Sequence, residues 1–304
     1  MSIVERALQK AQAQRPSAET ARPAETVSTS LTPEQPVESA QTEHEVVTAT
    51  QGTTVAQGTI VEIRMAQLRA EGRLVPEALA HQTEEEFRRI KWPLLNAILG
   101  RAEGPVANNV VLITSAIPGE GKTFNALNLA LSMAREPDFE VLLVDGDVAQ
   151  PALTGCLGLA GKPGLTDLVA DLRLDPAQLI HPTSIERLYV MPAGSRRDNS
   201  PELLASARMA TVIAELSSRA SPGVVLFDSP PVLATNEAQV LSRYAGQILM
   251  VVMADSTEQR VVTEALALLD RSKPVSAVLN RVEPSLVSRY YNHYYYGYGK
   301  DRRQ

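Results

Sequence analysis

The chain has 304 residues, of which 44% are hydrophobic and 4% aromatic, and its formal net charge at pH 7 is −6. That acidic balance argues against a nucleic-acid-binding protein, which normally carries a basic surplus. The single cysteine, Cys156, excludes an intramolecular disulfide and is expected to be a buried core thiol. No signal peptide and no apolar run of 18 residues is visible, so we expect a cytoplasmic chain.

The first 59 residues are expected to lie outside the folded domain. Residues 2–14 have the apolar spacing of a short amphipathic helix, which is either a frayed end or a docking element for a partner. Residues 15–59 are rich in Pro, Ser, Thr, Glu and Gln. Such a segment buries too little apolar surface to offset the entropy lost on ordering, so we predict a disordered linker.

Helical patterns follow between residues 60 and 100. Residues 60–74 have helical apolar spacing, and the TEEE run at 83–86 is typical of a capped helix start with acids near the positive end of the helix dipole. Pro93 inside the continuing pattern predicts a kink or a break. The charged outer face of this helix is either solvated or a subunit contact.

The stretch from 109 to 128 contains the strongest motif. An apolar VVLI run leads into SAIPGEGKT, and a helical pattern follows at once. This order of strand, glycine loop and helix is typical of a phosphate loop that binds a nucleoside triphosphate. The glycines let backbone N–H groups turn toward phosphate oxygens, while the lysine reaches the β- and γ-phosphates and the threonine holds Mg²⁺. The predicted nucleotide-binding residues of the loop are Pro118, Gly119, Glu120, Gly121, Lys122, Thr123 and Phe124.

Two later apolar runs end in carboxylates. Residues 140–145 are followed by a second acid at position 147, and residues 223–228 also end in aspartate. Because ligands of parallel α/β sheets bind at the carboxyl ends of the strands, Asp145, Asp147 and Asp228 are expected near the phosphates, although a surface acidic turn is the alternative for the first two. Asp228 suits a Mg²⁺ ligand that acts indirectly or through a bound water.

The remaining pattern completes an α/β domain. Strands are predicted at 188–192, 248–253 and 276–279, with a helix at 258–270. Strands that alternate with helices predict a mostly parallel sheet with helices on both faces. We therefore predict a P-loop NTPase fold over residues 60–287, preceded by the disordered N-terminal region and followed by a flexible tail at 288–304.

The tail concentrates tyrosines. Six of the eight tyrosines lie between positions 290 and 298, and no aliphatic residue follows Val287. A low-complexity tail or an aromatic subunit contact would account for this composition, but a nucleotide site in the same chain favours a set of phosphate acceptors. The candidate acceptors are Tyr290, Tyr291, Tyr294, Tyr295, Tyr296 and Tyr298.

These motifs resemble the bacterial tyrosine kinases of exopolysaccharide and capsule synthesis, with the exosortase-associated tyrosine autokinases as the most similar branch. SAIPGEGKT resembles the family's Walker A motif, VLLVDGDVAQP its Walker A′ motif and VVLFDSPPVL its Walker B motif, while PAGSRRDNSPELL resembles a segment between them. The resemblance implies transfer of phosphate from ATP to protein tyrosine, with Mg²⁺ and without the motifs of eukaryotic kinases.

The resemblance also implies roles for individual residues. Lys122, Asp145 and Asp147 would be catalytic, with one aspartate as general base, and Thr123, Asp147 and Asp228 would hold the metal. Asn280 and Arg281 match the place where the family holds adenine. Glu85, Arg88 and Lys91 match an oligomerisation motif whose last member is usually Arg, and Lys lacks the bidentate fork of Arg. Ala149 stands where many relatives carry Arg.

The partners that the resemblance implies are further copies of the chain, as a homo-oligomer or ring, and a separate membrane polysaccharide co-polymerase as activator. A phosphotyrosine phosphatase and recruitment to the inner face of the plasma membrane are also expected.

Two other functions stay open. An ATPase switch of the septum-site and chromosome-partitioning class is one, but Ile117 stands where that class has its signature lysine. The other is a nucleotide-dependent scaffold whose tail only makes contacts.

Overall fold

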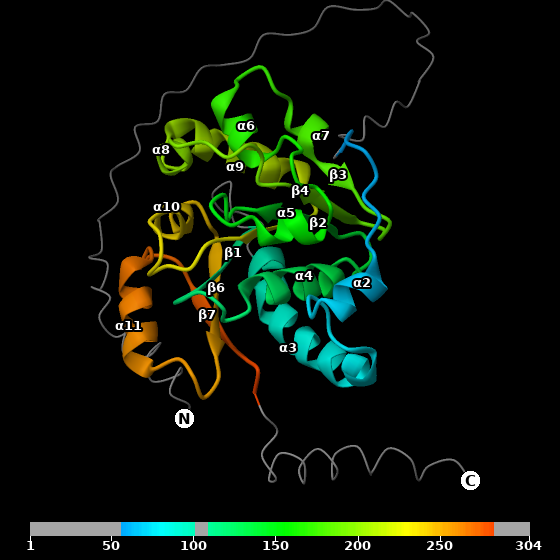
Figure 1. Ribbon diagram of the computed structural model, residues 1–304, viewed down its shortest axis with the longest axis vertical. Coiled ribbons are helices and arrows are strands. Elements are labelled where there is room, and N and C mark those ends of the chain that lie inside the picture. Colours follow the sequence, from blue (N-terminus) through cyan, green and yellow to red (C-terminus); the bar gives the residue numbers. More distant parts are fainter. Residues whose placement is uncertain (1–55, 101–108, 283–304) are drawn as a thin grey trace, which may run out of the picture.

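A mostly parallel sheet forms the centre of the molecule (Figure 1). The structure is a computed structural model that describes residues 56–100 and 109–282. Within these ranges seven strands are hydrogen-bonded in the order β3-β4-β2-β5-β1-β6-β7, and only the β3–β4 pair is antiparallel. The strands are β1 (Val110–Ser115), β2 (Glu140–Asp145), β3 (His181–Pro182), β4 (Leu188–Met191), β5 (Gly223–Asp228), β6 (Gln247–Met253) and β7 (Val275–Asn280).

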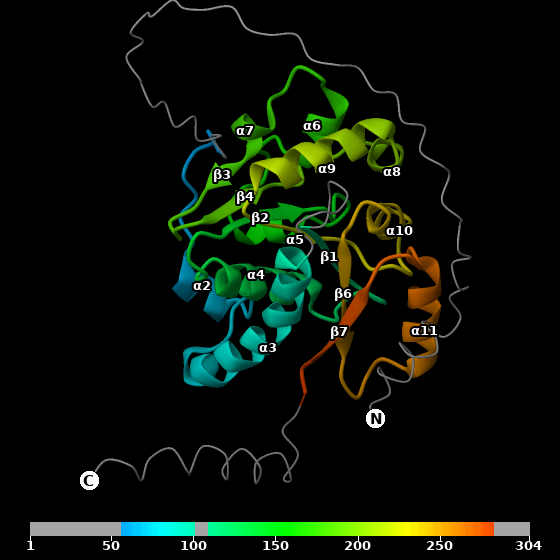
Figure 2. The same ribbon diagram turned by 180° about the vertical axis from the view of Figure 1, so that it is seen from behind.

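Helices cover both faces of the sheet, as the two opposite views show (Figures 1 and 2). On one face lie α2 (Met65–Ala70), η1 (Glu77–Leu79), α3 (Ala80–Leu99), α4 (Lys122–Met133) and α5 (Ala152–Cys156). On the other lie α6 (Leu165–Ala170), α7 (Pro176–Leu179), α8 (Ser200–Leu204), α9 (Ala207–Arg219), α10 (Glu237–Ser242) and α11 (Gln259–Leu268). The predicted P-loop NTPase architecture is confirmed.

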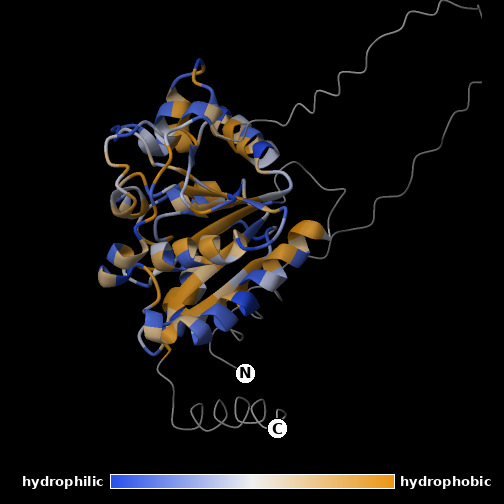
Figure 3. Ribbon diagram, turned by 90° about the vertical axis from the view of Figure 1, so that its right-hand side faces the viewer, coloured by the Kyte–Doolittle hydropathy of each residue, from blue (hydrophilic) through white to orange (hydrophobic). Residues whose placement is uncertain are grey.

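Each face of the sheet has its own hydrophobic core. Along β1, Val110 and Leu112 belong to the core beneath α9 and α11, whereas Val111 and Ile113 belong to the core beneath α3 and α4. This alternation follows from the period of two in a strand, and burial on both faces explains why the central strands are continuously apolar (Figure 3).

The helix start predicted at residue 83 is wrong. Helix α3 begins at Ala80 rather than at Thr83, and the Thr83 hydroxyl donates to the Leu79 carbonyl within the helix (3.0 Å) instead of capping it. The turn η1, directly after Pro76, has already set the helical direction there. The helix also runs through Pro93 without a break, because the burial of Leu94 and Leu95 outweighs the missing backbone bond.

Residues 57–63 run along the edge of the sheet. The N–H groups of Gln57, Gly58 and Val61 donate to carbonyls at positions 177, 180 and 182. Backbone bonds of this kind leave no side-chain pattern, so neither this attachment nor the two-residue strand β3 was predicted. The predicted helix at 2–14 and most of the predicted linker lie outside the described residues, as does the tyrosine-rich tail.

Within the described ranges, no helix combines the length and the apolarity that crossing a membrane requires.

Candidate active site

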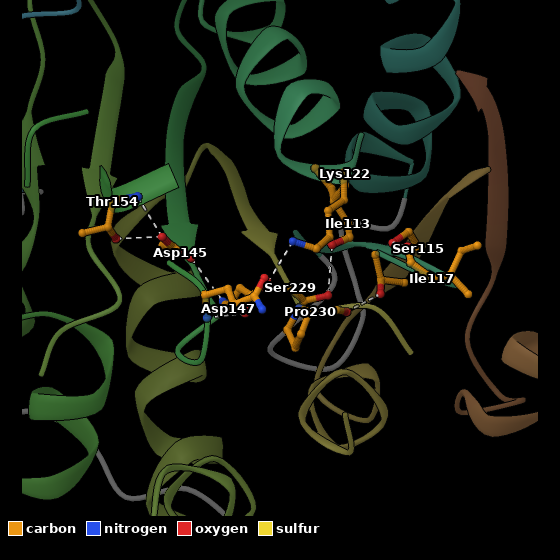
Figure 4. Close-up of polar contacts among 11 residues, drawn as sticks. Ile113, Ser115, Ile117, Lys122, Asp145, Asp147, Thr154, Ser229 and Pro230 are labelled. Atoms are coloured by element: carbon orange, nitrogen blue, oxygen red, sulfur yellow. Dashed lines mark hydrogen bonds and ion pairs between the residues drawn. The ribbon is translucent and has the colours of Figure 1, made fainter. Parts of the chain in front are cut away.

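The carboxyl ends of three neighbouring strands bring the predicted catalytic residues together. Asp145 at the end of β2 pairs in register with Asp228 at the end of β5, which in turn lies opposite Ile113 of β1. The phosphate loop begins two residues after Ile113. Figure 4 shows Lys122 from the start of α4 reaching toward Asp147 across this edge.

The phosphate loop depends on glycine at its junction with the helix. Gly121 is the N-cap of α4 and has φ of 95°, and Gly119 has φ of 85°. Residues other than glycine rarely adopt this left-handed backbone conformation. A Cβ on Gly121 would also lie 2.1 Å from Nδ2 of Asn280, so a larger residue would force the Asn280 side chain to move.

We expect Gly121→Ala to lower the free energy of unfolding by more than the ~1–2 kcal/mol that the left-handed conformation alone costs. Gly72→Ala is the matched control, because Gly72 has φ of 68° but open space around its Cβ position. Urea unfolding of both variants measures the difference. Equal losses in the two variants would show that the contact with Asn280 is not tight.

Lys122 is the cation of the site. Its Nζ lies 2.8 Å from Oδ2 of Asp147, and only 13% of the Lys122 side chain and 6% of the Asp147 side chain are exposed. Burial acts to lower the pKa of Lys122, but the carboxylates of Asp228 and Asp147 outweigh it and hold that pKa above its usual value. The lysine is therefore fully charged at neutral pH.

Asp145 is enclosed and held in place. Its Oδ2 accepts hydrogen bonds from the backbone N–H and the hydroxyl of Thr154 (2.8 and 2.7 Å), and its Oδ1 accepts from the backbone N–H of Asp147 (3.1 Å). Burial, followed by the charge of Asp228, raises the pKa of Asp145 to about 7. Thr154 was missed by the sequence analysis, since no motif marks a threonine at this place.

The Asp228 carboxylate has oxygens that are free to bind a ligand. Both of its carboxylate oxygens are buried without a hydrogen bond of acceptable geometry, which is uncommon for a native carboxylate. Burial raises its pKa to about 6, and the charge of Lys122 and the nearby Thr123 hydroxyl oppose that rise. A buried carboxylate with vacant lone pairs beside a threonine hydroxyl fits a Mg²⁺ ion, which prefers oxygen ligands.

No three acidic, histidine or cysteine side chains in the described ranges converge on one point as a metal cage. This agrees with the usual binding of Mg²⁺ in such sites through one or two carboxylates, substrate phosphates and water. The side chains that would hold it are those of Thr123, Asp147 and Asp228.

The other predicted nucleotide-binding residues divide into two groups. Pro118 and Gly119 are exposed at the tip of the loop, and the backbone of Lys122 and Thr123 forms the first turn of α4. The Glu120 side chain, in contrast, is fully buried and points into the fold, and Phe124 packs against the core beneath α3 and α4.

The predicted adenine residues lie beside the phosphate loop. Nδ2 of Asn280 donates to the Glu120 carbonyl (2.8 Å), and Nη1 of Arg281 donates to the Met253 sulfur (3.5 Å). A cavity of ≈ 410 Å³ adjoins them and is lined by residues 252–259, Val262 and Leu279.

The three predicted oligomerisation residues do not lie together. Glu85 and Arg88 form an exposed ion pair on α3 (2.8 Å). Lys91 is buried, and its Nζ donates to the Ser132 carbonyl (2.9 Å) and pairs with Glu136 (2.6 Å). The Lys91 ammonium group therefore links α3 to the end of α4 within the same subunit.

Cys156 is half-buried, and its sulfur donates to the Leu153 carbonyl. Burial raises its pKa to about 11, so the thiol stays protonated at neutral pH.

A phosphate loop between a buried strand and a helix, with carboxylates at the ends of the next two strands on one side, is typical of the P-loop class of nucleotide-binding proteins. Comparison with models of known protein families gave no match. The chain is 31% identical to CapB of Staphylococcus aureus over 215 residues, which cover 70% of this chain and 90% of CapB. It is 33% identical to the tyrosine-protein kinase YwqD of Bacillus subtilis over 59% of this chain and 75% of YwqD.

Solved structures agree with these relatives. The VpsO kinase domain is 30% identical and covers 64% of this chain and 98% of its own, with a TM-score of 0.53. The kinase domain of the Escherichia coli tyrosine kinase ETK is 26% identical and covers 62% of this chain and 73% of its own, with a TM-score of 0.55. The chain belongs to the bacterial tyrosine-protein kinase family, as its motifs predicted.

Some relatives are much longer. The chain spans only 27% of the tyrosine-protein kinase Wzc of Salmonella typhimurium, at 32% identity. The exosortase-associated branch stays a prediction, because none of these relatives is named for it.

Proposed function

We propose that the chain is an ATP-dependent protein-tyrosine autokinase that phosphorylates its own C-terminal tyrosines and thereby regulates exopolysaccharide synthesis or export. The observation that supports this most is the position of the Lys122 amine, at the start of α4 and among three carboxylates from the ends of β2 and β5. A charged lysine at a phosphate loop is the feature that phosphoryl transfer requires.

In the proposed reaction, the ATP phosphates bind the backbone of residues 119–123, and Lys122 leaves Asp147 to contact them. A tyrosine oxygen forms a bond to the γ-phosphorus while the bond to the β,γ-bridging oxygen breaks, and ADP is the leaving group. The tyrosine proton passes to Asp147, because the departure of Lys122 frees its Oδ2, whereas Asp145 is 0% exposed and keeps its hydrogen bonds from Thr154. Thr123, Asp147 and Asp228 would hold Mg²⁺, which would neutralise part of the phosphate charge.

The acceptor is proposed to come from another copy of the chain. The 17 residues after Val287 span at most ~60 Å when extended, enough to cross a subunit boundary. Each phosphate adds roughly −1.5 to −2 charges, so several phosphorylated tails would repel one another. Within a proposed homo-oligomer, the exposed Glu85–Arg88 pair is available to a neighbour, whereas Lys91 is not.

Other proposed partners are a membrane polysaccharide co-polymerase that activates the kinase and a phosphotyrosine phosphatase that resets the tail. Residues 2–14 are the proposed docking element for the activator at the inner face of the membrane. The solved chimerical protein CapA2B2, which is 26% identical with a TM-score of 0.58, supports the association of such a kinase with a second protein.

A mixing experiment tests transfer between chains. One chain carries Lys122→Met and all its tyrosines, and the other keeps Lys122 but has phenylalanine at the six tail tyrosines. We expect phosphotyrosine on the first chain only when both are present with Mg–ATP. If each chain phosphorylates only its own tail, the mixture will contain no phosphotyrosine, although the native chain alone becomes phosphorylated. An ATPase switch or a scaffold would give ADP release or binding without any phosphotyrosine.

A further inference from the structure

Glu120 lies inside the phosphate loop sequence, but its carboxylate faces away from the phosphate side. The side chain is 0% exposed and accepts three hydrogen bonds. Oε2 accepts from the backbone N–H of Ile117 (2.9 Å), and Oε1 accepts from the backbone N–H of Met253 (3.2 Å) and the hydroxyl of Thr257 (2.6 Å). A ligand in the loop has no access to this carboxylate.

These bonds join two separate segments. Ile117 lies within the phosphate loop, whereas Met253 ends β6 and Thr257 lies in the turn before α11. The backbone carbonyl of Glu120 accepts a further bond from Nδ2 of Asn280 at the end of β7 (2.8 Å). Glu120 therefore connects the loop after β1 with the ends of the two strands on its other side.

We propose that Glu120 is a positioning residue that fixes the phosphate loop in its binding conformation through Met253 and Thr257. The inference rests on the proposed function, since it takes the loop to bind the phosphates of ATP. A carboxylate is needed because both of its oxygens act only as acceptors, while all three partners are donors. Glutamine at this place sets an N–H₂ group against at least one of those donors.

The same contacts hold one wall of the ≈ 410 Å³ cavity, because Met253 and Thr257 line it. The position of this wall and the position of the phosphate loop are thus fixed by one side chain. Loss of the carboxylate is expected to disturb the ground state and the transition state alike, which raises KM more than it lowers kcat.

Glu120→Gln is expected to weaken Mg–ATP binding at least tenfold by calorimetry and to raise KM for ATP by a similar factor, with kcat within about threefold of the native value. Thr257→Val removes one donor without changing the loop and is expected to weaken binding by about threefold. The double variant should weaken binding by less than the product of the two factors, because both changes act on one contact.

Thr263→Val is the matched control, because the Thr263 hydroxyl donates to the Gln259 carbonyl within α11, away from the phosphate loop. Its affinity for Mg–ATP should equal that of the native chain. Unchanged affinity in Glu120→Gln and Thr257→Val, with only a lower melting temperature, would overturn the inference and leave Glu120 as a stabilising residue. Failure of the native chain itself to bind Mg–ATP would instead overturn the proposed function, and the inference with it.

Discussion

Lys122→Met is expected to lower ATP-dependent tyrosine phosphorylation by at least 10²–10³-fold, the usual loss when one charge-stabilising donor is removed from an active site. Lys122 pairs directly with Asp147, and the charges of Asp228, Asp147 and Asp145 all act on it, so its removal takes the lysine amine away from the phosphate site. The rate is measured as phosphotyrosine formed per minute by the purified chain at saturating Mg–ATP.

Two further variants separate the loss of chemistry from the loss of fold. Lys122→Arg keeps the positive charge beside the carboxylates and is expected to fold as the native chain does, yet to remain a poor kinase because the guanidinium presents its donors in a different geometry. Lys162→Met removes an exposed lysine away from the phosphate loop and should leave the rate unchanged. A Lys122→Met chain that phosphorylates tyrosine at the native rate would remove this residue from the mechanism.

Asp228→Asn is expected to abolish Mg²⁺-dependent phosphorylation and, at the same time, to stabilise the ligand-free protein at pH 8. The direction of this stability change follows from the pKa of Asp228, which is raised to about 6 from 3.8 for an ordinary aspartate. Between these two pH values the folded state binds more protons than the unfolded state, so stability falls as pH rises through the window. At pH 8 the full cost of the buried charge is present, on the order of 1–3 kcal/mol.

Thermal unfolding at pH 4 and pH 8 measures this effect. The melting temperature of Asp228→Asn should exceed that of the native chain by several degrees at pH 8 and by little at pH 4. Asp138→Asn, at an exposed position with φ of 55° that asparagine tolerates, should show no such difference. A melting temperature for Asp228→Asn below that of the native chain at pH 8 would contradict this prediction. It would mean that the buried Asp228 carboxylate stabilises the fold.

The sequence predicted the parts of the site that lie at strand ends. Strands β1, β2 and β5 are apolar on both faces and end at a polar residue, so Asp145 and Asp228 could be placed at one edge without coordinates. The parallel order of the sheet then required them to meet beside the phosphate loop. The strand boundaries followed from the same apolar runs, as at Glu140–Asp145 and Gly223–Asp228, where prediction and structure agree.

The direction in which a side chain points could not be predicted. Glu120 is part of the predicted phosphate loop, yet its carboxylate turns inward to partners 133 and 137 residues away along the chain. Lys91 likewise matched an oligomerisation motif, but it is buried and forms an ion pair with Glu136, which follows α4. Long-range partners of this kind leave no periodic pattern, and the start of α3 was misplaced because a local acidic run resembled a cap.

The most direct measurement of the central claim is mass spectrometry of the C-terminal peptide after the purified native chain is incubated with Mg–ATP. The account predicts phosphate on several of the six tyrosines between Tyr290 and Tyr298, and none in a parallel sample that carries Lys122→Met. An unmodified peptide from a native chain shown to bind Mg–ATP, or equal phosphate in both samples, would contradict it.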